Sequence, residues 1–182
     1  MNKTKIYKDI KEFQSIIYDI KHNPAFLETK YFKHHGADNT IYSHSIRTAY
    51  FVFKTCKILH LKENIKKSAT IAALLHDFFG YDWRKTEHIK NAKGFDRIKK
   101  MHAFNHGYEA ILNASKYYFL TEYQKDAILK HMFPIYPIPP KHIEGWLITF
   151  ADKIVAIEEL SHTTAYYTKA LIKKPIAHLQ RA

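Results

Sequence analysis

A histidine and an aspartate stand side by side in one of the most apolar stretches of the sequence. His76 and Asp77 directly follow residues 72–75, which are Ala-Ala-Leu-Leu, so both side chains are expected to lie inside the protein. Burying a carboxylate costs several kcal/mol unless it is paired or bound to a metal. Because a metal ion would satisfy both side chains at once, the pair predicts a buried metal site.

The remaining ligands of such an ion must come from other segments. Adjacent residues on a helix diverge by about 100°, so His76 and Asp77 reach one ion only near a helix end. His44 and Asp152 are the candidates for completing the site. Imidazole and carboxylate together suit Fe, Mn, Co, Ni or Zn.

A second ion is also predicted. A carboxylate such as Asp77 can bridge two ions, and His106 and His131 could hold the second one. The alternative is that these two histidines only shape the pocket of a single-metal site. Metal stoichiometry separates the two possibilities.

Cationic and polar residues near these positions are candidates for contacting a phosphate. Arg47 comes one turn after His44, and Lys153 directly follows Asp152. We expect both to stabilise negative charge during a reaction. Further candidates for binding a substrate are His102, His35, Asn105, Arg84 and Lys130.

Two of these candidates have alternative interpretations. His102 precedes His106 by four residues, so the two share a helix face and could also bind a metal jointly. His34 and His35 precede Gly36 in a loop and could line the same pocket, although adjacent loop histidines are more often simply exposed.

Apolar periodicity predicts that helices carry all of these residues. The expected helices cover residues 6–20, a short segment from Pro24, a helix capped by Ser43, and then 65–79, 95–114, 121–131 and 143–160, followed by a helical tail broken at Pro175. No alternating strand pattern of useful length and no linker interrupts the chain. The fold class is therefore all-α, with one domain spanning residues 1–182.

Five sequence blocks occur in an order that resembles the HD superfamily of metal-dependent phosphohydrolases. They are YSHSIRTA at 42–49, LLHDFFGYDW at 74–83, HAFNHGYEA at 102–110, AILKHMFP at 127–134 and TFADKIVA at 149–156. The blocks look like those of small, stand-alone bacterial HD proteins, and His106 and His131 resemble the two-metal branch. The resemblance implies a helical bundle of the HD-domain type with its core at about residues 30–160, to which the N-terminal helix and the C-terminal tail are added.

The resemblance also implies a reaction. HD proteins of this kind hydrolyse a phosphate ester or phosphoanhydride of a nucleotide-like small molecule through a metal-activated water. By similarity to the family, Lys153 is a better phosphate contact than Arg47. Two alternatives stay open: a single-metal nucleotidase, and a non-catalytic basic module that binds nucleic acid or an anionic effector.

Composition limits the partners and the compartment. The net charge of +12 comes from lysines scattered along the chain, so nucleic acid is possible as a partner but is not favoured. The charged start MNKTKIYKDIKEF lacks the apolar core of a signal peptide, and no apolar stretch is long enough to cross a bilayer. We expect a cytoplasmic protein that does not bind membranes, with the N-terminal helix and the tail available for a homodimer contact.

Overall fold

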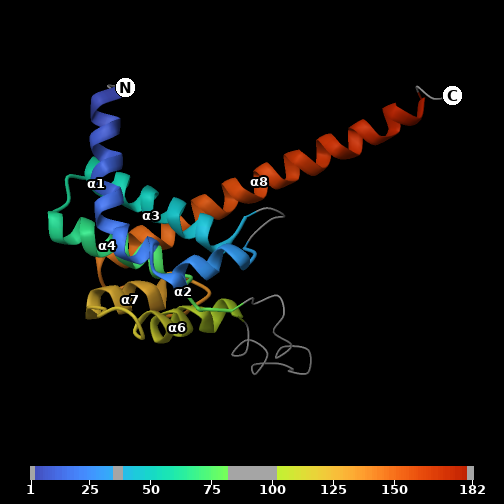
Figure 1. Cartoon of the computed structure of the whole chain (residues 1–182). Coiled ribbons are helices and arrows are strands. Elements are labelled where there is room, and N and C mark those ends of the chain that lie inside the picture. The colour runs from blue at the N-terminus through green and yellow to red at the C-terminus, as the bar shows by residue number, and fades with distance from the viewer. Residues whose placement is uncertain (1–2, 35–38, 82–101, 180–182) are drawn as a thin grey trace, which may run out of the picture.

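The computed structural model of the chain describes residues 3–34, 39–81 and 102–179, and only the backbone is described at 102–104 and 162–179. The helices are α1 (Lys3–Lys21), α2 (Pro24–Leu27), the 3-10 helix η1 (Glu28–Tyr31), α3 (Ile41–Ile58), α4 (Glu63–Leu75), α6 (His102–Ala114), α7 (Glu122–Lys130) and α8 (Ile143–Leu179) (Figure 1). Within these ranges no β-strand occurs, and one isolated bridge joins Lys33 to Thr40. The predicted all-α fold is confirmed.

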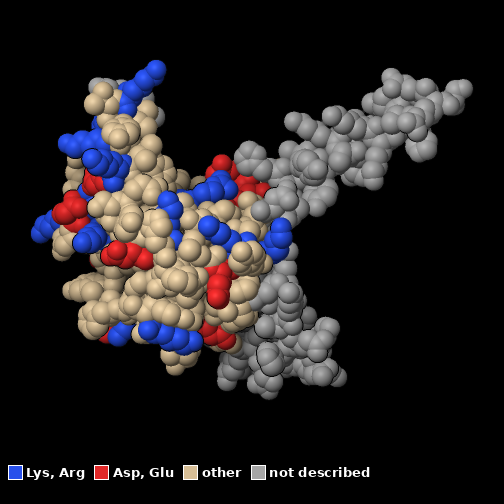
Figure 2. All heavy atoms as spheres, viewed as in Figure 1, with Lys and Arg blue, Asp and Glu red and all other residues tan. Residues whose placement is uncertain are grey.

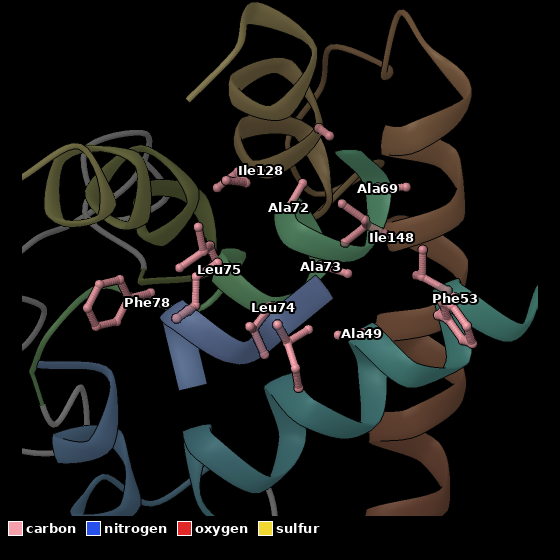
Figure 3. Close-up of a cluster of buried hydrophobic side chains, with 14 of the residues drawn as sticks. Ala49, Phe53, Ala69, Ala72, Ala73, Leu74, Leu75, Phe78, Ile128 and Ile148 are labelled. Carbon is pink, nitrogen blue, oxygen red and sulfur yellow. The ribbon is translucent and has the colours of Figure 1, made fainter. Parts of the chain in front are cut away.

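Helix α4 lies at the centre of the fold and packs against α1, α3, α6, α7 and α8. Its last turn is entirely apolar and fully buried, so no polar face is left near its C-terminal end. Leu74 and Leu75 belong to one buried apolar cluster with side chains from the surrounding helices, including Phe53 of α3 and Ile128 of α7 (Figure 3). Each large side chain buried in this way contributes about 1.5–3 kcal/mol. The packing therefore fixes the place where α4 ends, which is where His76 and Asp77 follow.

Helix α3 begins earlier than the sequence predicted. The N-cap is Thr40, not Ser43: the Thr40 hydroxyl accepts a hydrogen bond from the Ser43 amide, and the Ser43 hydroxyl accepts one from the Thr40 amide. This reciprocal capping box satisfies two amides that the first turn of a helix leaves without partners. His44 is therefore the fourth residue of α3.

Two other helix ends differ from the sequence prediction. Helix α4 stops at Leu75 rather than Phe79, with His76 as its C-cap. Helix α8 continues to Leu179, past the break predicted at Pro175. At a rise of about 1.5 Å per residue, α8 is about 55 Å long, and Figure 1 shows its second half running away from the other helices.

The N-terminal helix is joined to the body by ion pairs as well as by apolar side chains. Asp9 of α1 is buried and contacts the ammonium groups of Lys54 and Lys57, each at 2.6 Å. Glu12 pairs with Lys57 and with the buried Lys66 of α4.

On the face shown in Figure 2, basic side chains are spread among acidic and uncharged ones.

Among the described residues, no helix is both long enough and apolar enough to cross a membrane.

Candidate metal centre

The structure brings together all six residues that the sequence proposed as metal ligands, from five different helices. His44 comes from α3, His76 is the C-cap of α4 and Asp77 follows it, His106 comes from α6, His131 is the C-cap of α7, and Asp152 comes from α8. All six are buried, and His44 and His76 have no exposed surface. A shared buried cluster of this kind requires either internal pairing or a cation.

Two of the histidines are oriented by the ends of their own helices. His76 Nδ1 lies 2.7 Å from the carbonyl oxygen of Ala73, and His131 Nδ1 lies 2.7 Å from that of Ile128. A carbonyl can only accept, so Nδ1 carries the proton in both rings and Nε2 faces the centre of the cluster with its lone pair. Within the described part of the chain, His76 Nε2 is buried and has no hydrogen-bond partner. An imidazole held in this tautomer is ready to bind a metal.

A carboxylate orients His44. Its Nδ1 lies 3.1 Å from Oε2 of Glu159, which is itself buried on α8. The other oxygen of Glu159 accepts a hydrogen bond of 3.0 Å from the Arg47 guanidinium. Because Glu159 holds Nδ1, the Nε2 atom of His44 faces the cluster, 3.0 Å from Oδ1 of Asp152. Carboxylate–histidine pairs of this type commonly support metal ligands.

Asp77 lies at the centre, and its two oxygens face different groups of imidazoles. Oδ2 is 3.5 Å from His76 Nε2 and 3.9 Å from His44 Nε2. Oδ1 is 3.4 Å from His106 Nε2 and 3.8 Å from His131 Nε2. Asp77 therefore separates the cluster into a first group, with His44, His76 and Asp152, and a second group, with His106 and His131.

The spacing of the donor atoms fits metal coordination. Two ligands bound to one ion at about 2.0–2.1 Å lie about 3.0–3.4 Å from each other. In the first group, Asp152 Oδ1 is 3.0 Å from His44 Nε2 and 3.6 Å from His76 Nε2. In the second group, His106 Nε2 and His131 Nε2 are 2.8 Å apart. The donors of His44, His76 and Asp152 lie within 4.8 Å of one another, as do those of His76, Asp77 and His131. These residues could hold a metal ion without large rearrangement.

The charge states of Asp77, Asp152 and His131 also suit a cation. Burial by itself raises the pKa of Asp77, but His76 and the other surrounding imidazoles outweigh it and hold this pKa well below its usual range. The same balance, with His44 and His76 as the main partners, holds the pKa of Asp152 well below its usual range. Burial, together with neighbouring His106 and His76, lowers the pKa of His131 to about 3. Two ionised carboxylates and a neutral His131 are the forms that bind metals.

The predicted phosphate-binding residues are placed as follows. Lys153 is partly buried beside the cluster and donates hydrogen bonds of 3.3 Å to the carbonyl oxygens of His131 and Thr149. Burial lowers the pKa of its ammonium group. The guanidinium of Arg47 pairs with Glu158 at 2.9 Å as well as with Glu159.

The structure describes only some of the other residues that the sequence predicted as substrate contacts. Lys130 is buried and paired with Asp126, and Asn105 is partly buried next to His106. His35 and Arg84 lie outside the described residues, and for His102 only the backbone is described. Their role in binding a substrate stays a prediction.

Two residues of the cluster were not among the metal ligands that the sequence predicted. His34 Nε2 lies 3.0 Å from Asp77 Oδ2, whereas the sequence had favoured its neighbour His35 as a site residue. Glu159 follows Asp152 by seven residues, two helical turns, which places both on one face of α8. That spacing was a usable signal for Glu159, while the adjacent histidines offered no basis for choosing between them.

A glycine allows the two histidines of the second group to come together. A Cβ atom on Gly107 would lie 2.8 Å from the carbonyl oxygen of Ile128 and 3.0 Å from that of Leu129. Real Cβ atoms do not approach backbone oxygens this closely, so α6 can lie against α7 at this point only because residue 107 lacks a side chain. Gly107 adjoins His106, and the Ile128 oxygen is the one that orients His131.

In comparisons with known proteins, no family model, curated protein or solved structure matches the chain.

Proposed function

We propose that this protein is a metal-dependent phosphohydrolase of the HD type, which hydrolyses a phosphate ester or phosphoanhydride of a nucleotide-like small molecule. The observation that carries the proposal is the position of Asp77, whose two oxygens each face a different pair of histidines. A single structural ion would need only one of these groups. A carboxylate with imidazoles on both sides is suited to bridge two ions.

The order of the residues supports the family assignment. His44, the His76–Asp77 pair, His106, His131 and Asp152 occur along the chain in the order that the resemblance implies. The all-α fold and the buried His/Asp cluster are compatible with that family. The class of substrate rests on this resemblance.

Bound ions and protein side chains would supply different parts of the chemistry. Two bound divalent ions would acidify a water molecule and neutralise phosphoryl oxygens. The chain supplies the rigid ligand set, in which Ala73, Ile128 and Glu159 fix the imidazole orientations. Lys153, beside the cluster, supplies the positive charge for a phosphate oxygen after releasing its present carbonyl partners. No side chain is required as a nucleophile.

The first experiment measures metal content by mass spectrometry together with phosphate release from a panel of nucleotides in the presence of Mn²⁺ or Fe²⁺. We expect about two transition-metal ions per wild-type chain, and loss of both metal and phosphate release in Asp77→Ala. His131→Ala should keep one ion, because the first group of ligands is intact. His22→Ala is the matched control, since His22 is exposed and its ring contacts Tyr18 of its own helix region, outside the cluster.

The outcomes distinguish the alternatives. One ion per chain in the wild type, unchanged by His131→Ala and accompanied by phosphate release, would support the single-metal nucleotidase instead. No metal and no phosphate release under any condition would refute the enzyme proposal and leave the basic binding module.

A further inference from the structure

The His34 side chain is buried in the cluster although it precedes all the helices that carry the other ligands. Only 6% of the residue is exposed. The backbone holds it in place: Lys33 forms a bridge with Thr40, and the His34 amide donates a hydrogen bond of 2.9 Å to the carbonyl oxygen of Asn39. Thr40 in turn caps α3, the helix that carries His44. His34 is therefore positioned by the same local structure that positions His44.

The ring of His34 faces the first group of ligands. It stacks on the ring of His44, with 3.9 Å between centroids and 28° between planes. Its Nε2 lies 3.0 Å from Asp77 Oδ2, the oxygen that also faces His44 and His76. The donor atoms of His34, His44 and Asp77 lie within 4.8 Å of one another.

Two roles fit a buried histidine in this position. His34 could donate a hydrogen bond to Asp77 and stay outside the coordination sphere, or it could bind the ion itself. The 3.0 Å between His34 Nε2 and Asp77 Oδ2 fits both roles, because it is the length of an ordinary hydrogen bond and also the separation of two ligands on one ion, about 3.0–3.4 Å. The arrangement of the donors favours the second role, because Nε2 of His34 and Nε2 of His44 both face Asp77 Oδ2 and the three residues place their donor atoms within 4.8 Å of one another.

We propose that His34 is a ligand of the first ion, alongside His44, His76, Asp77 and Asp152. The inference rests on the proposed metal centre and deepens it. The first ion then has five protein donors, whereas the second has only His106, His131 and the shared Asp77. Exchangeable coordination positions are therefore concentrated on the second ion, between α6 and α7. The phosphate group of the substrate binds on that side.

Binding of Co²⁺ tests directly whether His34 is a ligand of the first ion. In the Co²⁺-loaded protein, each coordinated imidazole gives a hyperfine-shifted ring N–H signal in the proton NMR spectrum. We expect His34→Gln to lose one such signal relative to the wild type and to weaken binding of the first Co²⁺ ion at least tenfold. His22→Gln, an exposed histidine in the same N-terminal region, should keep every signal. Circular dichroism establishes that both variants are folded.

The failure of this inference can be told apart from failure of the proposed function. If the wild type binds Co²⁺ and His34→Gln retains all of the wild-type imidazole signals, His34 is outside the coordination sphere and the inference is overturned. If the wild type binds no Co²⁺, the metal centre itself is refuted. A folded variant that has lost only the His34 signal confirms the assignment without reference to catalysis.

Discussion

Replacing Gly107 by alanine should damage the second group of ligands while leaving the first intact. The added Cβ would lie 2.8 Å from the Ile128 carbonyl oxygen, so α6 and α7 must move apart by a few tenths of an ångström or more. That oxygen holds the Nδ1 proton of His131, and His106 is the residue before the substitution. The change therefore displaces both imidazoles of the second group at once.

The effect on folding is smaller than the effect on metal binding. Overpacking a tight contact costs about 1–3 kcal/mol, whereas alanine is about 1 kcal/mol more favourable than glycine inside a helix. The net loss of unfolding free energy is then about 0–2 kcal/mol, or a decrease in Tm of up to about 8 °C for a domain of this size. Disturbing the support of a metal ligand weakens binding by about 10–100-fold.

Isothermal titration with Mn²⁺ or Co²⁺ and thermal unfolding test both parts. We expect Gly107→Ala to retain the first ion at wild-type affinity and to lose affinity for the second. Leu112→Ala, on the exposed side of the same helix, is the control and should bind both ions normally. If Gly107→Ala binds both ions as tightly as the wild type, the close contact between α6 and α7 does not organise the second group.

Two further predictions concern other parts of the structure. Asp9→Asn should destabilise the protein by up to about 2 kcal/mol at pH 7, because its hydrogen bonds with Lys54 and Lys57 lower the pKa of Asp9 from 3.8 to about 2. This contribution is complete above pH 3.8 and is lost as the pH falls towards 2. In urea unfolding, the difference between wild type and variant should therefore shrink by about half at pH 3, and a difference that does not change with pH would contradict the assignment. Glu159→Gln should weaken binding of the first ion about 10–100-fold, because it releases His44 Nδ1. Glu158→Gln is the control and should not weaken binding, since the Glu158 side chain is 53% exposed. Equal metal affinities in the two variants would refute the orienting role of Glu159.

The fold could be predicted because most helices are strongly periodic or well capped. The helix expected at residues 121–131 and the short helix starting at Pro24 are both present, the first with a capping box formed by Thr121 and Gln124. Helix ends were less predictable. Ser43 looks like a cap by residue type, but only the structure shows that it is the third residue of a capping box that begins at Thr40.

The candidate site could be predicted where polar residues interrupt apolar segments, as at His76 and Asp77. Glu159 does not interrupt an apolar segment, because it follows another glutamate, so its one sequence signal is the spacing of seven residues from Asp152. The pairing with His44 Nδ1 depends on how α3 crosses α8, a tertiary contact that local patterns do not encode. The role of Gly107 also depends on a tertiary contact. From the sequence it only weakens a helix, whereas the structure shows that a Cβ atom at this position would collide with the backbone of α7.

The ligands of the first ion also tie together distant parts of the chain. His44 and Asp152, two of the proposed donors, are 108 residues apart. An ion held between them closes a loop that contains most of the core helices, so it acts as a reversible crosslink. In the unfolded chain these donors are dispersed, so the free energy of binding adds to the stability of the folded state in proportion to the logarithm of free metal concentration. The lifetime of the protein in a cell would then depend on the supply of metal as well as on its hydrophobic core.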